Sequence, residues 1–468
     1  MSLDPAAEPL GIDPILDDRR TRIVVCCGSG GVGKTTTAAA LGLRAAERGR
    51  KVVVLTIDPA RRLAQSMGID ELDNVPRRVP GIDGSAGGEL HAMMLDMKRT
   101  FDEIVEAHAD KDRARAILDN PFYQSLSAGF AGTQEYMAME KLGQLRARDE
   151  WDLIVVDTPP SRSALDFLDA PSRLGSFLDG KLIKLLMAPA RVGGRAGMKF
   201  LGVGMSVMSG PLNKLMGAQL LQDVQTFVGA MDTMFGGFRT RADATYRLLQ
   251  APGTAFLVVA APERDALREA AYFVERLAAE RMPLAGVVLN RVHGSGADRL
   301  SAERALAAAE ALEGGLVNGP GEYTENLDGD GIVDRGSGQA GSRTADDPGT
   351  LTPTDTSSPS PERGFPQPTS TGPSAAELAA GLLRLHADRM QVIAREQRTR
   401  DRFTALHPDV PVAEVAALPG DVHDLAGLRS IGDRLAQQTT AAQQTTAADQ
   451  TTAGERAATD ARESADPS

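Results

Sequence analysis

The sequence predicts an α/β fold, a doubly wound and mostly parallel sheet with helices on both faces. Short runs of aliphatic residues recur along the 468-residue chain, and runs of this kind form strands that are buried on both faces. The first run, residues 23–27, is followed by a glycine-rich loop, a helical stretch over 36–46 and a second apolar run over 51–57. A strand, a helix and a strand in this order form a right-handed βαβ unit, which requires a parallel sheet.

The remaining elements continue this alternation of strands and helices. Further strands are predicted at residues 89–95, 153–156, 255–261, 284–291 and 410–418. Helices are predicted at residues 97–109, 264–279, 301–312 and 425–435. Another helix is expected to begin at Ser374, which forms a capping box with Glu377. Strands that alternate with helices in this way are typical of a sheet covered by helices on both faces.

The glycine-rich loop after the first strand fits the phosphate-binding pattern G-x-x-x-x-G-K-[ST]. Its backbone N–H groups, together with the N-terminus of the following helix, are expected to bind nucleotide phosphates. Lys34 is expected to contact the β- and γ-phosphates, and the Thr35 hydroxyl to coordinate Mg²⁺. A chance match among the 48 glycines of the chain is disfavoured by the flanking strand and helix. The predicted nucleotide-binding residues are Gly28, Ser29, Gly30, Gly31, Val32, Gly33, Lys34 and Thr35.

Two aspartates follow predicted strands. Asp58 comes directly after the second strand, at the edge where open α/β sheets bind their ligands, and it is expected to orient the water that attacks the γ-phosphate. An N-cap role before Pro59 is an equally open alternative. Asp157 ends an apolar run of the Walker B form and is expected to hold Mg²⁺ with Thr35. A turn aspartate after a strand is the alternative. Lys34, Asp58 and Asp157 are therefore the predicted catalytic residues.

Asn290 lies at the end of the predicted strand over residues 284–291, on the same side of the sheet as the glycine-rich loop. Its side-chain amide is therefore a candidate to pair with the adenine edge of a nucleotide. The alternative is an asparagine that caps a turn.

Residues 172–250 are predicted to form a helical subdomain inserted into the sheet domain. The segment is rich in glycine and carries seven methionines, at positions 187, 198, 205, 208, 216, 231 and 234. A surface lined with methionine can repack around varied apolar partners. The segment is either a surface for an apolar client or membrane-protein partner, or ordinary core.

Three segments are predicted to be disordered. Residues 1–20 are acidic and contain three prolines, residues 314–373 lack aliphatic repeats, and residues 437–468 repeat Gln, Thr and Ala. The sheet domain is therefore expected to cover residues 21–313 and to be completed by the helix, strand and helix of residues 374–436.

The net charge of −12 is concentrated in these segments. Residues 321–370 carry nine acidic and three basic residues, and residues 441–468 carry five and two. The folded part is close to neutral and shows no basic patch with interleaved aromatic residues, so no nucleic-acid partner is expected. A cytoplasmic protein, in peripheral contact with a membrane at most, is expected, because neither a secretory signal nor a run of about 18 apolar residues is visible. The two adjacent cysteines are expected to be buried core residues.

Four motifs occur in the order found in the arsenite-pump and tail-anchored-protein-targeting ATPase family. They are the segment Gly-Ser-Gly-Gly-Val-Gly-Lys-Thr-Thr-Thr, Thr-Ile-Asp58-Pro-Ala, Asp157-Thr-Pro-Pro and Val-Val-Leu-Asn290. The chain resembles an actinobacterial-type member over about residues 20–300 and 374–436. The resemblance implies that Gly28 to Thr36 is a P-loop of the deviant Walker A type and that Asp58 is the switch I residue. It also implies that Asp157 opens switch II and that Pro262 and Asn290 border the adenine.

The chain departs from this family at positions that concern assembly. The signature lysine, second in the loop, is Ser29 here, and in the family that lysine reaches the phosphates of a partner subunit. The Cys-x-x-Cys pair that binds zinc between subunits is absent, and so is a cysteine cluster for arsenite. The resemblance therefore implies the fold, the ATP and Mg²⁺ site and a dimer, but neither the zinc-linked dimer nor the metalloid activity.

Two functions follow from these observations. The first is a dimeric ATPase that couples its nucleotide state to an apolar client or membrane partner, either with a second copy or as a heterodimer with a related subunit that keeps the lysine. The second is a regulatory nucleotide-binding subunit that hydrolyses ATP slowly or not at all and completes the site of its partner. Lys34, Thr35, Asp58 and Asp157 favour the first function, and the serine at position 29 favours the second.

Overall fold

The computed structural model describes residues 9–57, 61–121, 123–124, 133–159, 227, 237, 240–317 and 374–437. The chain divides into two compact units, one formed by residues 1–294 and 392–468 and the other by residues 295–391. The first unit contains the sheet and the glycine-rich loop, and the second contains most of two helices.

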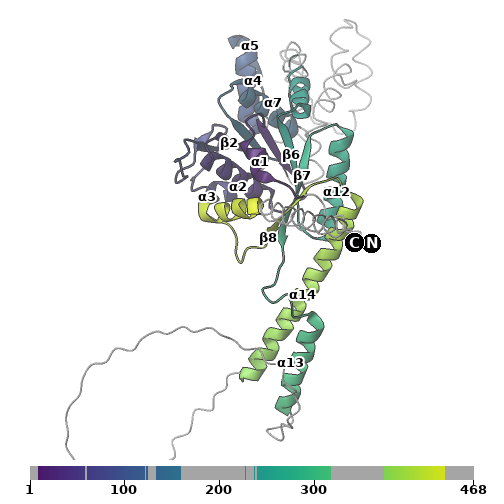
Figure 1. Ribbon diagram of the computed structural model, residues 1–468. Helices are drawn as coiled ribbons and strands as arrows, with labels where there is room; N and C mark the ends of the chain where they lie inside the picture. Colours follow the sequence, from purple (N-terminus) through teal and green to yellow (C-terminus); the bar gives the residue numbers. More distant parts are fainter. Residues whose placement is uncertain are drawn as a thin grey trace, which may run out of the picture. The chain divides into compact units, whose positions relative to one another are not determined.

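The first unit is built on an eight-stranded sheet (Figure 1). The strands are β1 (Ile23–Cys27), β2 (Lys51–Thr56), β3 (Arg77–Arg78), β4 (Glu89–Met94), β5 (Leu153–Asp157), β6 (Thr254–Ala260), β7 (Leu284–Val292) and β8 (Val412–Ala416). They lie in the order β3-β4-β2-β5-β1-β6-β7-β8. Every neighbouring pair is parallel except β3 with β4. The predicted mostly parallel sheet is confirmed.

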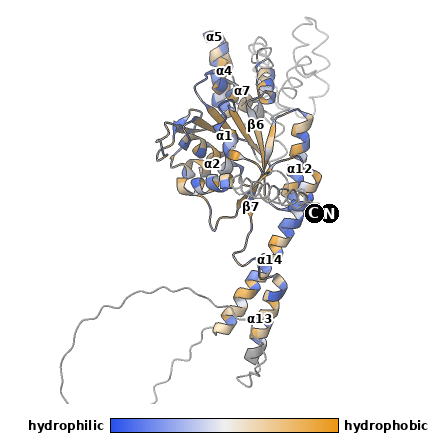
Figure 2. Ribbon diagram, viewed as in Figure 1, coloured by the Kyte–Doolittle hydropathy of each residue, from blue (hydrophilic) through white to orange (hydrophobic). Residues whose placement is uncertain are grey.

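Helices cover both faces of the sheet. They are α1 (Ile12–Asp17), α2 (Lys34–Glu47), α3 (Arg61–Ser66), α4 (Met97–His108), α5 (Lys111–Leu118), α7 (Thr133–Ala147) and α12 (Arg264–Ala279), with a further helix over residues 425–437. Buried side chains of α1, α2, α3 and the helix 425–437 share one core with alternate residues of the strands, and those of α4, α5, α7 and α12 share a core on the other face. In β1, Val24 belongs to the first core and Val25 to the second. The apolar strands between these layers are visible in Figure 2, and the doubly wound arrangement is confirmed.

The N-terminal segment corrects the prediction of disorder over residues 1–20, because residues 9–20 are ordered. The backbone N–H of Leu10 donates to the carbonyl of Val412 at the sheet edge, at 3.0 Å. Ile12 and Leu16 of α1 are buried in the core on the α2 side. Asp13 pairs with Arg44 of α2 at 2.6 Å, which lowers the pKa of the carboxyl group. The acidic, proline-containing composition concealed a short amphipathic helix whose charges have partners.

Arg50 joins this segment to the sheet. Its guanidinium donates to the carbonyl oxygens of Leu16 at 2.8 Å, of Thr21 at 2.5 Å and of Asp152 at 2.5 Å. The side chain is buried, and burial lowers the pKa of Arg50. A buried cation needs hydrogen-bond acceptors to offset its lost hydration. The backbone carbonyl groups around α1 and before β5 supply these acceptors to the guanidinium.

The C-terminal elements follow the prediction. α14 (Ala375–Leu406) begins with the predicted capping box, in which the Ser374 N–H donates to Glu377 Oε2 at 2.7 Å and the Glu377 N–H donates to Ser374 Oγ at 3.2 Å. β8 adds to β7 in parallel at the sheet edge, and the last helix packs Leu428 into the core on the α2 side.

Several predictions fall outside the described residues. Most of the Met-rich segment 172–250 lies there; the structure describes its residues 227, 237 and 240–250. The segments 318–373 and 438–468 of the predicted insert and tail also lie outside. α13 (Ala302–Val317) extends past residue 314, where the insert is predicted to begin.

The second unit contains α13 and the first part of α14. Arg384 forms an ion pair with Glu313 at 2.5 Å, and His386 Nε2 donates to the carbonyl of Leu300 at 2.7 Å. No helix among the described residues has the length and apolarity needed to cross a bilayer.

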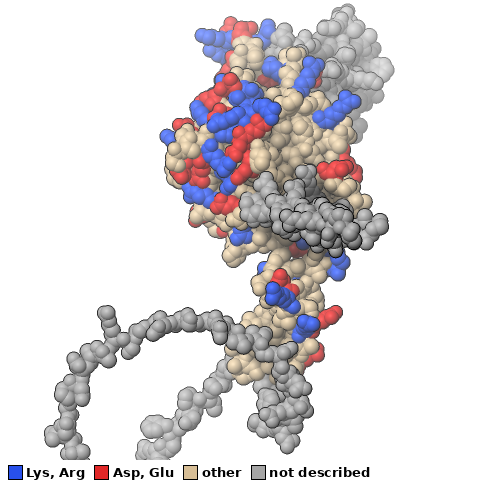
Figure 3. Space-filling view, viewed as in Figure 1, with Lys and Arg blue, Asp and Glu red and all other residues tan. Residues whose placement is uncertain are grey.

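The surface of the first unit mixes charges of both signs on the face shown in Figure 3. Lys and Arg side chains alternate there with Asp and Glu side chains. Ion pairs of the first unit include Arg48 with Asp13 and Arg77 with Asp73. Among the described residues, no field of a single sign dominates this face.

The buried cysteines predict a pH dependence of stability. Burial raises the pKa of the Cys27 thiol to about 12. The unfolded thiol titrates first, near pH 8.5, so the free energy of unfolding is expected to fall as the pH rises above this value, by up to about 1.4 kcal/mol per pH unit for this thiol. Urea unfolding of the wild type and of Cys27→Ala between about pH 8 and 10 measures the effect. A steeper decline in the wild type is expected, and equal slopes would contradict the assignment.

Candidate nucleotide-binding site

The glycine-rich loop leaves the carboxyl end of β1 and leads into α2, as the motif requires. Gly28 has φ 148°, and a Cβ at this position would lie 2.0 Å from the carbonyl oxygen of Val259 in β6. Gly33, the N-cap of α2, has φ 94°, and a Cβ there would lie 2.2 Å from Asn290 Nδ2. Because neither position accommodates a side chain, the loop packs as bare backbone against two neighbouring strands. Exposed backbone N–H groups at a helix N-terminus form an anion-binding site.

Lys34 lies inside the loop that precedes it. Its Nζ donates to the carbonyl oxygen of Ser29 at 2.7 Å, and the residue is only 5% exposed. Lysine is strongly hydrated in water, so a buried ammonium is stable only where oxygen atoms surround it. The loop thus holds a positive charge at its centre, where an anion would bind.

Asp157, at the end of β5, connects three elements at this edge. Its Oδ2 accepts hydrogen bonds from Thr35 Oγ1 of α2 at 2.6 Å and from Thr56 Oγ1 of β2 at 3.0 Å. The parallel register pairs Asp157 with Cys26 of β1 and with Thr56 of β2, so the carboxyl ends of the three strands meet. The negative charge of Asp157, second to burial, raises the pKa of the Cys26 thiol, while Lys34 lowers it.

The residues present fit Mg²⁺ and a nucleotide phosphate. Thr35 and Asp157 offer a hydroxyl and a carboxylate oxygen within 2.6 Å of each other, and oxygen donors of this kind are those that Mg²⁺ prefers. The loop provides backbone N–H groups and one lysine for phosphate oxygens. The predicted residues Thr35 and Asp157 are therefore brought together next to Lys34.

Asn290 also reaches the loop, by a contact that the sequence did not suggest. Its Nδ2 donates to the carbonyl oxygen of Val32 at 2.8 Å, and its Oδ1 accepts from the N–H of Arg291 at 3.0 Å. Pro262 is buried two residues after the end of β6, before α12. That Asn290 and Pro262 border an adenine stays a prediction.

Asp58 lies outside the described residues, together with Pro59 and Ala60, so its role as the residue that orients water stays a prediction. Its neighbour Ile57 is fixed on both sides. The N–H of Ile57 donates to the carbonyl of Asp157 at 3.0 Å, and Gln134 of α7 donates to the carbonyl of Ile57 at 2.9 Å. No sequence pattern pointed to Gln134, whereas Thr56 could have been recognised as a hydroxyl at the end of an otherwise aliphatic strand.

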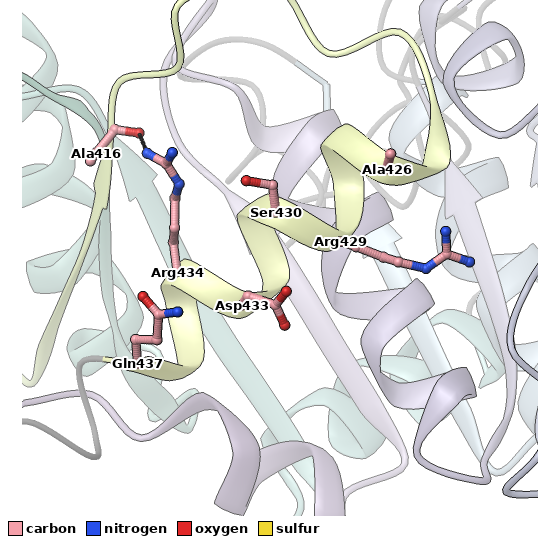
Figure 4. A pocket seen from close by; sticks show the side chains of 7 residues that line it. All are labelled: Ala416, Ala426, Arg429, Ser430, Asp433, Arg434 and Gln437. Atoms are coloured by element: carbon pink, nitrogen blue, oxygen red, sulfur yellow. Dashed lines mark hydrogen bonds between the residues drawn. The ribbon is translucent and has the colours of Figure 1, made fainter. Parts of the chain in front are cut away.

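A separate groove of about 680 Å³ lies along the helix 425–437 and the end of β8 (Figure 4). The charged side chains that line it form hydrogen bonds and ion pairs with other residues of the chain. Arg434 donates to the carbonyl of Ala416, Arg429 pairs with Glu47, and Asp433 pairs with Arg44. These three charged side chains therefore already have partners within the first unit.

The fold and this site define a P-loop nucleotide-binding protein of the doubly wound α/β class. A model of the anion-transporting ATPase family matches residues 21–304, more than half of the chain. The chain belongs to this family, whose ATPases typically use ATP with Mg²⁺.

Curated relatives are similar over different shares of the chain. "ATPase GET3" of Malassezia globosa is 31% identical over 172 residues, which are 37% of this chain and 49% of the relative. "ATPase GET3" of Podospora anserina is 26% identical over 310 residues, 65% of this chain and 83% of the relative. "ATPase get3" of Schizosaccharomyces pombe is 32% identical over 183 residues, 39% and 52%. The chain thus spans about half the length of the first and third of these proteins and most of the second.

Gly31 and Gly33 of the loop give a matched test of the packing against Asn290. Gly31 also has a positive φ, 76°, but a Cβ there would meet nothing within 4 Å. Gly31→Ala is expected to cost about 1 kcal/mol from backbone strain alone. Gly33→Ala must in addition displace Asn290, so it is expected to lower the free energy of unfolding further and to weaken ATP binding at least about tenfold more than Gly31→Ala. Urea unfolding and calorimetric titration with ATP measure both, and equal effects of the two variants would show that the contact with Asn290 is unimportant.

Proposed function

We propose that this chain is an ATPase that binds ATP with Mg²⁺ at the loop of residues 28–36 and hydrolyses it to ADP and phosphate. The observation that carries the proposal is the junction of Thr35, Asp157 and Lys34 at the carboxyl edge of the sheet, with 2.6 Å between the threonine hydroxyl and the carboxylate. Family membership supports the same activity.

Each residue has a distinct role in the proposed reaction. The loop backbone binds and orients the phosphates, Lys34 places its positive charge against the β- and γ-phosphates, and Thr35 with Asp157 holds the metal ion. Mg²⁺, when bound, neutralises charge that develops on the phosphate oxygens. Asp58 accepts a hydrogen bond from the attacking water and orients it. Asn290 and Pro262 border the base.

We further propose that the nucleotide state controls a dimer and an apolar client. The methionines of the segment 172–250 supply the adaptable apolar surface that such a client needs. The protein then acts in the cytoplasm or at a membrane surface, beside a client or membrane-protein partner. Relatives named as ATPases support the catalytic part of this proposal, and the client rests on the composition of the segment.

The second candidate function rests on one residue. The family resemblance implies that Ser29 stands in place of a lysine that would serve the partner's phosphates, and the short neutral side chain of Ser29 would carry no charge to that site. The chain would then bind nucleotide but turn it over slowly, and would work beside a related subunit that keeps the lysine.

Lys34→Ala tests the nucleotide site. The substitution removes the charge that contacts the β- and γ-phosphates, and ATP binding is expected to fall at least about tenfold, since truncating a buried charged contact costs about 2–5 kcal/mol. Asp58→Asn is expected to leave the affinity for ATP unchanged and to lower hydrolysis. Calorimetry and a phosphate-release assay measure the two quantities. Unchanged affinity and turnover in Lys34→Ala would show that the loop is not the ATP site.

Ser29→Lys tests the heteromer. A cation supplied across a subunit interface is worth about 10³–10⁵ in rate, so restoring the lysine is expected to raise the ATPase rate of the isolated chain at least about tenfold. Ser29→Gln, which is long but neutral, is the control and is expected to have no such effect. A lysine-bearing homologue from the same cell is expected to bind the wild type and raise its rate. A fast wild-type homodimer that no homologue stimulates would overturn the heteromer.

A further inference from the structure

Strand β7 contains a β-bulge directly after Asn290, the residue that contacts the glycine-rich loop. The pairing of β7 with β8 shifts register between Asn290 and Val292, and the residue between them, Arg291, has φ 62°. Val288 belongs to the core on the α2 side, whereas Val292 belongs to the core on the opposite side. In a regular strand these two residues would share a face, because side chains alternate. The bulge therefore lets Asn290 face the loop while the chain after it returns to the other core.

The residue after the bulge is fixed by a carboxylate from α14. Glu396 Oε2 accepts the backbone N–H of His293 at 3.0 Å, and Glu396 Oε1 lies 2.6 Å from His293 Nδ1. Glu396 is buried, with 8% of the residue exposed. A buried carboxylate that binds the backbone and the ring of one residue restricts both, and it makes its strongest hydrogen bonds with charged or strongly polarised donors. His293 is thereby held in one orientation three residues after Asn290.

We propose that Glu396 and His293 form a latch that positions Asn290 and, through it, the nucleotide-binding loop. The inference rests on the proposed nucleotide binding. The side-chain amide of Asn290 donates a hydrogen bond to the carbonyl of Val32, the residue before the N-cap Gly33. The first backbone N–H groups of α2 come directly after Gly33 in the chain. A movement of the bulge changes the direction of these N–H groups toward a phosphate. Glu396 and His293 are positioning residues, and they act through Asn290 without contacting the nucleotide.

The latch predicts an effect on phosphate binding that does not depend on the base. If Asn290 acted only on adenine, loss of the latch would weaken the binding of ATP and spare that of inorganic tripolyphosphate, which has no base. If the latch positions the loop, tripolyphosphate loses affinity as well as ATP. The two ligands therefore separate the loop effect from an adenine effect.

The experiment measures dissociation constants of Mg²⁺ with ATP and with tripolyphosphate for the full-length chain by calorimetry. Glu396→Ala and His293→Ala are expected to weaken both ligands about three- to thirtyfold, the range found for residues that act through a coupled contact. His293→Asn keeps a donor near the position of Nδ1 and is expected to restore binding to within about threefold of the wild type.

The control removes a comparable contact on the same helix. Arg400 of α14 pairs with Glu414 of β8 at 2.5 Å, with an Arg400 side chain that is 18% exposed. Arg400→Gln also loosens α14 from the sheet edge but leaves His293 in place, so it is expected to leave both affinities unchanged. Thermal unfolding of every variant identifies any that fails to fold, and Glu396→Gln, which keeps an acceptor for the His293 N–H, replaces Glu396→Ala in that case with a smaller loss in the same direction.

Several outcomes overturn the latch. Unchanged affinities in the folded Glu396 and His293 variants refute it, while loss of ATP binding in Lys34→Ala shows that the nucleotide site itself is correctly assigned. An equal loss in Arg400→Gln would show that general packing of α14 is responsible. A loss for ATP without a loss for tripolyphosphate would confine the effect to the base. A wild type that binds neither ligand would refute the proposed function and the latch together.

Discussion

The site depends on the hydrogen bonds that the carboxylate of Asp157 accepts from two threonine hydroxyls. A single oxygen, Oδ2, accepts from Thr35 of α2 and from Thr56 of β2, and Asp157 is fully buried. A buried carboxylate without donors would be strongly unfavourable, so these hydroxyls and the strand register that delivers them are required together. The register follows from the parallel pairing of β5 with β1 on one side and with β2 on the other. The site therefore exists because the sheet places the carboxyl ends of these strands at one edge.

The glycine-rich loop is held from both sides of β1. On the β5 side, Thr35 at the start of α2 is bound to Asp157. On the other side, Asn290 reaches from β7, past the intervening β6, to the carbonyl of Val32. The glycines stand where these approaches are too close for a Cβ, Gly28 against the backbone of β6 and Gly33 against the amide of Asn290. Glycine in this loop thus serves packing against neighbouring strands as well as access to phosphate.

The parts of the fold that rest on local patterns could be predicted from the sequence. The loop, its strand and its helix are contiguous, and Asp157 ends a run of aliphatic residues, so both were found. Contacts between distant segments could not be predicted, because Glu396 and His293 are 103 residues apart and neither belongs to a motif. The bulge at Arg291 was hidden for a similar reason, since a positive φ at an arginine leaves no mark in the sequence. The helix α1 was missed because prolines and acidic residues outweighed the spacing of Ile12 and Leu16.

Ser29 separates two properties of the loop that a lysine at this position would combine. Its carbonyl oxygen, which any residue would supply, accepts the hydrogen bond from Lys34, so this contact does not depend on the chemistry of the side chain at position 29. In the proposed heteromer, the side chain at position 29 would also decide whether a charge is delivered to another subunit, and serine delivers none. In the proposed function, nucleotide binding is therefore encoded in the backbone of the loop and in Lys34, Thr35 and Asp157. In the proposed heteromer, the rate would be set by which subunit brings a cation, so a chain with an intact binding site would depend on a partner for turnover.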